Sequence, residues 1–243
     1  MLTRKKQLLL CGAIILAAAA VFAGVRTINN NKHLPIPADP AYDLKQIAVK
    51  YYAASRMALA GTIYLFEDAR ATSPKEVTPF KYFRQNLQTY AQLGRIRTYN
   101  ANDVSLQVDS IDKTVVVSRQ QLNAQPEFLE SLLRDTANFK ARSLNDENGL
   151  KVIEFINAQT PNIKACRIYY TPGTYELRHC TIEWWKDGAG EEATDTSVWI
   201  TKIDYTGWAC DMDVEKEIHD ILSFDGRDPQ LRTSYTGYQL TIL

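Results

Sequence analysis

Three short segments in the middle of the chain limit its fold more than any other feature. Apolar and β-branched side chains alternate with other residues in segments 96–100 and 104–108, and residues 114–118 are a β-branched run. A period of two is typical of β-strands, and the polar residues 109–112 are typical of a turn between two of them. The sequence therefore predicts a meander of three antiparallel strands.

Further strands are predicted on both sides of this meander. Strand-like patterns recur in segments 62–66, 152–156, 164–170, 175–185, 197–205 and 233–243. Two other segments each fit more than one structure. Residues 80–93 fit a helix by their spacing and a strand by their aromatic content, while residues 215–222 fit a short helix or an irregular strand.

Two amphipathic helices are also predicted. Asp39 and Pro40 are typical of a helix N-cap and first turn, and apolar side chains then recur at helical spacing up to Gly61. A second helix is predicted over residues 125–139, with Pro126 near its start. An amphipathic helix must bury its apolar face, so strands and helices together predict an α+β fold.

The N-terminus has the pattern of an export segment. A basic cluster at residues 4–6 precedes the uncharged stretch 8–25, which is typical of a secretory signal with cleavage after Ala23. The same stretch reaches the lower length limit of an uncleaved membrane anchor. The predicted organisation is a signal peptide or transmembrane anchor over residues 1–25, a polar tether over 26–38, and a single domain over 39–243.

Composition and motifs exclude several classes of function. The chain has 28 basic and 28 acidic side chains and no basic run beyond its first residues, so no nucleic-acid-binding face is expected. It has three histidines, no C-x-x-C or H-E-x-x-H spacing, no Gly-rich phosphate loop and no G-x-S-x-G turn. We therefore expect no metal, no cofactor and no nucleic-acid partner.

Carboxylates crowd at one place, around Asp211 and Asp213. Two carboxylates this close can share a divalent ion, but Lys216 stands where a calcium loop of the EF-hand type requires glycine. We interpret the cluster as a solvated acidic surface. The best residues of an enzyme would be Asp211, Asp213 and His219, and the pair of Cys210 and His219 lacks a recognisable third group, so we expect no catalytic activity.

Two cysteines flank a predicted turn at residues 171–174. A three-residue loop would place Cys166 directly opposite Cys180, within reach of a disulfide. A two-residue loop would pair Ile168 with Leu177 and send the two thiols to opposite faces of the sheet. The second register matches apolar residues better, and the sequence leaves the disulfide open.

Aromatic side chains are the most distinctive chemical feature. The chain has 13 tyrosines, 8 phenylalanines and 4 tryptophans, and every tryptophan lies in the C-terminal half. Trp184 and Trp185 are adjacent on a predicted strand and therefore point to opposite faces. Large rings on both faces indicate either a second covering layer or an apolar groove.

The order of the predicted elements carries a family resemblance. A leading helix ends near residues 59–61, and it is followed by the strand 62–66, the meander segments 106–109 and 113–117, and a closing strand at 235–240. This order resembles the lipoprotein-carrier (LolA-like) superfamily, whose members fold as an incomplete, strongly curved antiparallel barrel and hold acyl chains in its concavity. The resemblance implies a half-barrel covered by two or three helices, and it makes residues 80–93 a strand.

Aromatic richness without catalytic motifs, together with this resemblance, predicts a non-catalytic cell-envelope protein that binds an apolar ligand. The expected ligand is a lipid or a lipoprotein acyl chain, held in the concave sheet. Burial of such a chain contributes about 0.8 kcal/mol per CH₂ without any charged contact. The predicted ligand-binding residues are Tyr64, Phe66, Trp184 and Trp199.

An alternative function stays open at this point. The chain also fits a membrane-tethered structural or assembly subunit, whose aromatic face binds another envelope protein. Both functions place the protein outside the cytoplasm. It is expected to be periplasmic, or anchored through residues 8–25 to the inner membrane and facing the periplasm.

Overall fold

The computed structural model describes residues 39–52, 54–119, 139–145, 148–157, 163–186, 198–224 and 228–243. The predicted signal or anchor, the tether and nearly all of the predicted helix 125–139 lie outside these residues. Within them, no helix is both long and apolar enough to span a bilayer.

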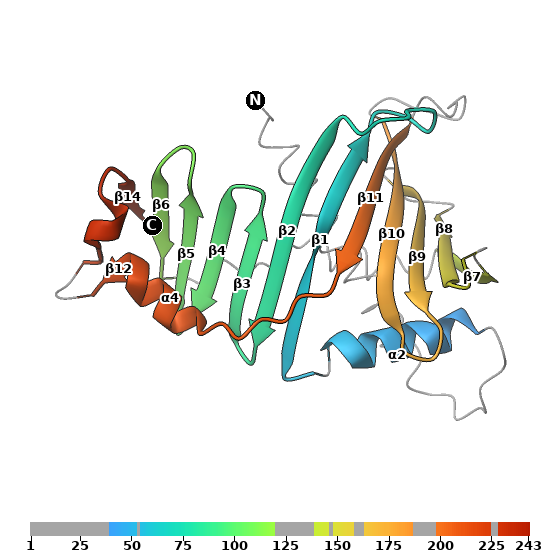
Figure 1. Ribbon diagram of the computed structural model, residues 1–243, viewed down its shortest axis with the longest axis horizontal. Coiled ribbons are helices and arrows are strands. Elements are labelled where there is room, and N and C mark those ends of the chain that lie inside the picture. The colour runs from blue at the N-terminus through green and yellow to red at the C-terminus, as the bar shows by residue number, and fades with distance from the viewer. Residues whose placement is uncertain are drawn as a thin grey trace. The chain divides into compact units, whose positions relative to one another are not determined.

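Most of the described chain belongs to one unclosed sheet of twelve strands (Figure 1). Its strands are β1 (Arg56–Phe66), β2 (Glu76–Gln85), β3 (Gln88–Leu93), β4 (Ile96–Ala101), β5 (Val104–Asp109), β6 (Thr114–Ser118), β7 (Phe139–Asn145), β8 (Lys151–Asn157), β9 (Ile163–Thr171), β10 (Glu176–Trp185), β11 (Val198–Thr206) and β14 (Gln239–Ile242). They follow the order β14-β6-β5-β4-β3-β2-β1-β11-β10-β9-β8-β7, so β14 and β7 are the edges. β14 runs parallel to β6, whereas consecutive strands pair antiparallel in the meander β2–β6 and in the series β7–β11.

Two α-helices are described, α2 (Pro40–Tyr52) and α4 (Val214–Ile221). A second sheet consists of β12 (Leu222–Ser223) and β13 (Gln230–Leu231), and a 3₁₀ turn, η3, spans Thr233–Tyr235. The predicted meander is confirmed as β4, β5 and β6. The two ambiguous segments are also settled, since residues 80–93 lie in β2 and β3, and residues 215–222 lie mainly in α4.

The first predicted helix is too long at its C-terminal end. Asp39 caps it as expected, because its Oδ1 accepts the Ala41 N–H at 2.9 Å. The helix ends at Tyr52, however, and residues 56–61 begin β1 instead. Ala and Leu favour a helix in this segment, but pairing within the sheet buries Met57 and Gly61 and overrides that local preference.

Two other predicted boundaries are wrong. Phe139, the last residue of the second predicted helix, is the first residue of β7. The predicted strand 233–243 begins with η3, and only its last part, β14, is a strand. Gly237 separates the two with φ +88°, a left-handed conformation that breaks a strand.

Backbone contacts divide the chain into two compact units. Unit 1 consists of the described residues within Met1–Ala54, Thr62–Val77 and Gln125–Tyr205, and unit 2 of those within Ser55–Gly61, Thr78–Ala124 and Thr206–Leu243. Each unit therefore gathers segments that are distant in sequence, and each is described below by itself.

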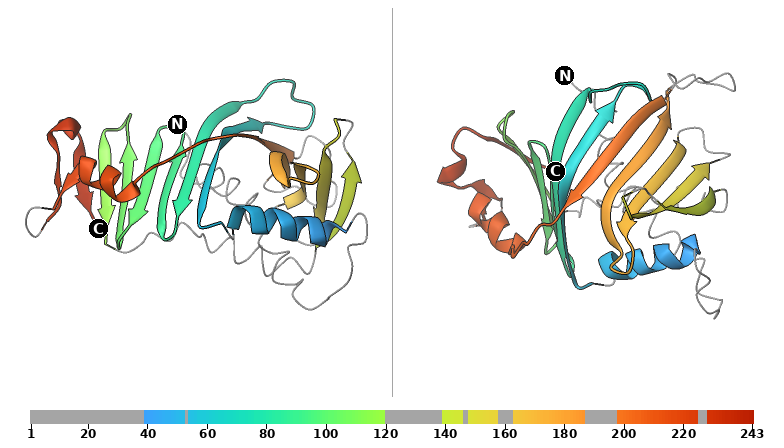
Figure 2. Two further views of the ribbon diagram at one scale, coloured as in Figure 1. Left: turned by 60° about the horizontal axis from the view of Figure 1, so that its bottom comes forward. Right: turned by 45° about the vertical axis from the view of Figure 1, so that its right-hand side comes forward.

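In unit 1, α2 lies against one face of strands that curve around it (Figure 2). The buried residues of this face are cross-strand neighbours: Ile153 on β8 is opposite Ile168 on β9, which is opposite Cys180 on β10, which is opposite Ile203 on β11. We refer to this side of the sheet as the α2 face. Ile47 of the helix is fully buried, as are Ile153 and Ile203, so the face is the apolar core of unit 1.

Polar contacts fix α2 at one end of these strands. The Tyr170 hydroxyl at the end of β9 donates to the buried carboxylate of Asp43, and Lys151 Nζ lies 3.5 Å from the same carboxylate. The Tyr51 hydroxyl accepts the Leu177 N–H at 3.0 Å at the start of β10. These contacts hold the helix beside the β9–β10 hairpin.

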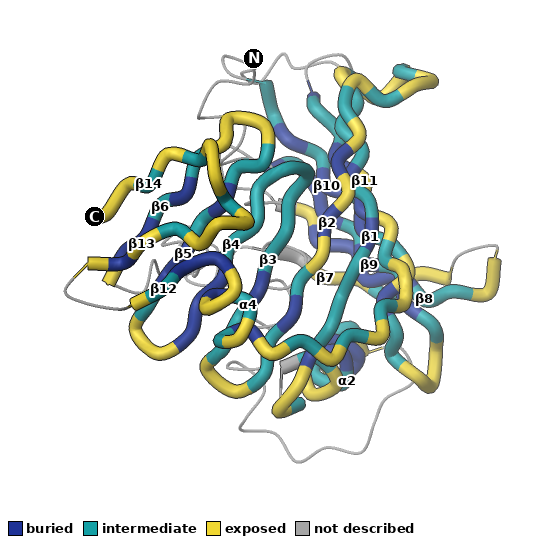
Figure 3. The backbone as a smooth tube through the Cα atoms, turned by 60° about the vertical axis from the view of Figure 1, so that its left-hand side comes forward, coloured by how far each residue is buried: buried dark blue, intermediate teal, exposed yellow. Residues whose placement is uncertain are grey.

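In unit 2, the C-terminal segment packs on one face of the meander (Figure 3). Cross-strand neighbours Tyr90, Tyr99 and Leu106 form the centre of that face, and Ile218 and Ile221 of α4 are buried against the same cluster. Tyr90 and Tyr99 contact each other with ring centroids 5.1 Å apart. The apolar side of α4 is thus the covering layer of this unit.

The β9–β10 hairpin has neither predicted register. Its loop has four residues, 172–175, and a register shift follows between Leu177 and His179. Cys166 is therefore opposite Ile182, and Cys180 is opposite Ile168. The left-handed conformations of Gly173 and Tyr175 lengthen the loop beyond both predicted forms.

Cys166 and Cys180 consequently share the α2 face as diagonal neighbours. Their Sγ atoms are 3.8 Å apart, both thiols are free, and both side chains are buried. The hydrogen bond with Cys166 and burial raise the pKa of the Cys180 thiol. Cys210 is free and half-exposed.

This arrangement predicts a clear order of thiol reactivity. Iodoacetamide at pH 8 should alkylate Cys210 first in the native protein, because its side chain is half-exposed, although partial burial raises the pKa of its thiol. Cys166 and Cys180 should stay at least tenfold less modified until urea unfolds the protein. Peptide mapping by mass spectrometry measures all three sites at once, and native labelling of Cys166 at the rate of Cys210 would contradict the buried position.

Candidate functional site

A pair of tryptophans lies at the other end of the α2 face. Trp184 on β10 and Trp199 on β11 are direct cross-strand partners, so both rings lie on the face that carries Cys180 and Ile203. Trp184 is 7% exposed, and its indole N–H donates to Thr201 Oγ1 at 3.1 Å. Trp199 is half-buried. We refer to Trp184, Trp199 and Thr201 as the tryptophan end.

The tryptophan end is far from the contacts that hold α2. At about 3.3 Å per residue, Trp184 lies roughly 20 Å along β10 from Leu177. α2 is the only helix described in unit 1, and its hydrogen bonds with Tyr170 and Leu177 lie at the hairpin end of the strands. The two ends of the α2 face therefore differ in chemistry, with a helix and a buried carboxylate at one and indole rings at the other.

Two lysines place their charges on the ring of Trp199. Lys75 Nζ lies 5.0 Å from the ring centroid and Lys186 Nζ lies 5.5 Å from it, both within cation–π range. Lys75 also pairs with Glu67 at 2.7 Å, and its hydrogen bond lowers the pKa of that exposed carboxyl group. The tryptophan end is thus bordered by cations.

Lys75 and Lys186 are missing from the site predicted by sequence. One signal for Lys186 was present, because it follows Trp184 by two residues and side chains at that spacing share a face of a strand. Lys75 carries no such signal. It reaches Trp199 because the Lys75 N–H bonds the Leu65 carbonyl at 2.7 Å, a contact between segments joined by a loop.

The structure brings together only two of the four predicted ligand-binding residues. Trp184 and Trp199 are adjacent on the α2 face, but Phe66 lies 5.0 Å from the ammonium of Lys202. Lys202 alternates along β11 with buried Thr201 and Ile203, so Phe66 belongs to the opposite face, and Tyr64 shares that face with it. A single ligand on one face cannot contact all four.

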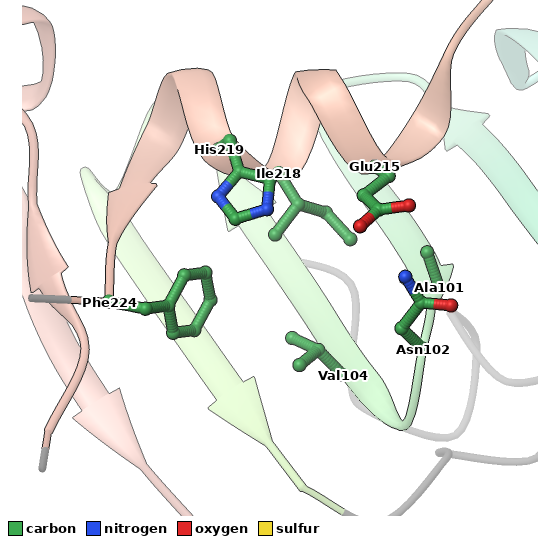
Figure 4. Close-up of a pocket in the computed structure, with 7 residues that line it drawn as sticks. All are labelled: Ala101, Asn102, Val104, Glu215, Ile218, His219 and Phe224. Atoms are coloured by element: carbon green, nitrogen blue, oxygen red, sulfur yellow. The ribbon is translucent and has the colours of Figure 1, made fainter.

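Unit 2 has a small pocket of its own (Figure 4). A cavity of about 210 Å³ lies between α4 and the β4–β5 hairpin. Ile218, Val104 and Phe224 supply apolar wall, and Glu215 and His219 line it from α4. Its volume is below the usual range of about 300–1,000 Å³ for small-molecule sites.

The acidic cluster has a structural explanation. The Asp213 carboxylate caps α4 by accepting the Lys216 N–H at 3.0 Å, and Asp211 pairs with Arg56 at 2.9 Å while its side chain is 94% exposed. His219 lies in the last turn of α4, with its ring 5.4 Å from that of Phe224. In the part of the chain that the structure describes, no three His, Cys, Asp or Glu side chains are grouped to hold a metal ion.

Comparison with known proteins gives similarities to solved structures alone. No protein-family model matches the chain, and no curated protein matches it. Similar solved structures include an uncharacterized conserved protein from Thermus thermophilus, with 8% identity over 83% of this chain and 98% of that one, at a TM-score of 0.42. A DUF1329 family protein from Desulfovibrio piger shares 9% identity over 69% and 89% of the two chains, at a TM-score of 0.30.

A LolA superfamily protein from Nitrosomonas europaea is also similar. It shares 8% identity over 72% of this chain and 96% of its own, at a TM-score of 0.25. These likenesses assign no role to any residue of this chain.

Proposed function

We propose that this chain is a non-catalytic cell-envelope protein that binds an apolar ligand, a lipid or an acyl chain, at the tryptophan end of the α2 face. The observation that carries the proposal is the adjacency of Trp184 and Trp199 on an apolar face roughly 20 Å from the contacts of α2. Indole rings supply large contact area for alkyl chains.

The chemistry of the neighbouring residues supports binding more than catalysis. Ile163 is opposite Trp184 on β9, and Ile182 is two residues along β10, so the surroundings of the rings are apolar. The polar side chain in contact with Trp184 is Thr201, which already accepts its indole N–H. A ligand here would gain free energy from burial of its CH₂ groups, about 0.8 kcal/mol each.

A test of this function is the mass of the protein purified from an oxidising compartment without detergent. We expect the native mass to exceed the denatured mass by one lipid per chain. Trp199→Ser should lower the bound fraction at least fivefold, since it removes half of the indole pair. Trp185→Ser is the matched control, because Trp185 follows Trp184 on β10 and points to the opposite face, where Lys164 lies 5.3 Å from its ring.

Equal retention by both variants would contradict the proposed site. A folded protein without any adduct would instead favour the second candidate function, a tethered structural or assembly subunit. One observation supports that alternative. Leu144 on the edge strand β7 and Ile156 on the neighbouring strand β8 are 39% and 40% exposed. An edge strand with exposed apolar side chains is suited to pairing with a strand of another chain.

A further inference from the structure

We propose that the ligand is an anionic amphiphile, whose headgroup binds Lys75 and Lys186 while its chain lies against Trp184 and Trp199. This inference rests on the proposed function and names the class of its ligand. It is carried by the convergence of two ammonium groups on one ring, at 5.0 and 5.5 Å from the Trp199 centroid.

The two lysines come from different parts of the sequence but lie on the same face. Lys186 directly follows β10, two residues after Trp184, a spacing that places both side chains on the same face of a strand. Lys75 precedes β2, and its backbone N–H bonds the Leu65 carbonyl. Both ammonium groups therefore lie beside the Trp199 ring. A carboxylate or phosphate between them would make charge-assisted hydrogen bonds, which are about twice as strong as neutral ones.

The existing ion pair of Lys75 leaves room for this headgroup. Its ammonium has three N–H donors, and the contact with Glu67 at 2.7 Å accounts for one of them. The Lys75 and Glu67 side chains are 46% and 57% exposed, so their pair is in water and easily rearranged. A second anion can therefore bind Lys75 without breaking a buried contact, in competition with Glu67, whose charge also interacts with Lys186.

The opposite face offers matched control lysines. Lys202 lies 5.0 Å from the Phe66 centroid and Lys164 lies 5.3 Å from the Trp185 centroid, the same type of contact on the other side of the sheet. A general attraction of anions to surface lysines would involve these lysines equally. A headgroup site on the α2 face would involve only Lys75 and Lys186.

The test compares dodecanoate with dodecanol, which have the same chain but differ in charge. Calorimetric titration of the delipidated full chain at pH 8 should give at least tenfold tighter binding of dodecanoate. The double variant Lys75→Gln and Lys186→Gln should lose this preference and keep its affinity for dodecanol, while Lys202→Gln should behave like the wild type. Dodecyl phosphate in a parallel titration distinguishes a phosphate headgroup from a carboxylate by which of the two binds tighter.

The outcomes separate the two proposals. If the wild type binds both ligands equally, or if Lys202→Gln loses the preference as the double variant does, the headgroup site is overturned while the proposed function stands. If the wild type binds neither ligand, the proposed function fails and the headgroup site fails with it. The thermal unfolding midpoints of all variants, measured by circular dichroism, should agree within a few degrees, because each replaced lysine is at the surface.

Discussion

Arg167→Leu should lower the free energy of unfolding by about 3 kcal/mol, although Arg167 lies on the face of the sheet opposite the α2 face. Glu154 on β8 is 2% exposed, and its carboxylate accepts hydrogen bonds from Arg142 and from Arg167, the latter at 2.7 Å. Arg167 also donates to Glu183 at 2.9 Å. Loss of Arg167 would leave a buried carboxylate with one cation fewer, which is among the more destabilising changes known.

Urea unfolding followed by circular dichroism measures this effect, and two further variants define its cause. Arg178→Leu on β10 removes an exposed arginine that pairs with Glu176 at 3.1 Å, so it should cost less than about 1 kcal/mol. Glu154→Met combined with Arg167→Leu removes the buried charge as well and should recover at least half of the loss. A cost for Arg167→Leu no larger than that of the control would contradict the importance of this network.

The same network predicts how the stability of the protein changes at low pH. Burial alone raises the pKa of Glu154, but the hydrogen bonds from Arg142 and Arg167 outweigh it and leave the pKa lowered. A carboxyl group with a lowered pKa in the folded state stabilises the protein above its unfolded pKa, about 4.3. That contribution is lost as the pH falls through the folded pKa. The difference in the free energy of unfolding between wild type and Arg167→Leu should therefore become smaller at low pH.

The strands were largely predictable from sequence because their side chains alternate. The meander residues 96–118 were found at nearly their observed boundaries, since each strand buries one side and a period of two is preserved. The β1 segment 56–61 was missed because Ala, Leu and Met fit a helix as well, and only pairing with other strands decides between the two. The secondary-structure preference of the local sequence was therefore a reliable guide only where the burial pattern favoured the same structure.

Half of the candidate site was predictable from sequence, because alternation within one strand can be read locally and pairing between strands cannot. Adjacent rings on one strand can be assigned to opposite faces, which separated Trp184 from Trp185 correctly. The pairing of Trp184 with Trp199, by contrast, depends on the register between β10 and β11, and the face of Phe66 depends on its contact with Lys202. Neither is encoded locally, because a shift by one residue exchanges the faces of an entire strand.

The free energy of unfolding should begin to fall just above pH 10, and buried tyrosines should cause this loss of stability. Burial raises the pKa of Tyr99, and burial together with the hydrogen bond to Asp43 raises the pKa of Tyr170. Both side chains are at most 1% exposed. A group whose folded pKa is raised keeps its full contribution below the unfolded pKa, which is about 10 for tyrosine, and loses it as the pH rises beyond that value.

The size of this loss of stability follows from the linkage between tyrosine ionisation and unfolding. In the unfolded chain each of the two tyrosines ionises above pH 10, which favours unfolding by about 1.4 kcal/mol per residue at pH 11, or about 3 kcal/mol for both. Urea titrations at pH 8, 10 and 11 should show this decline, and absorbance at 295 nm should show the two phenols ionising together with unfolding.

Tyr170→Phe separates this effect from a general sensitivity to base. At pH 8 the variant should be less stable than the wild type by about 1–3 kcal/mol, because the buried Asp43 carboxylate loses its hydroxyl donor. At pH 11 the difference in the free energy of unfolding between the two proteins should be about 1.4 kcal/mol smaller, since the variant has no phenol at this position to ionise on unfolding. Parallel stability curves for the two proteins from pH 8 to 11 would show that Tyr170 ionises as readily in the folded state as in the unfolded one, in conflict with its place between α2 and the sheet.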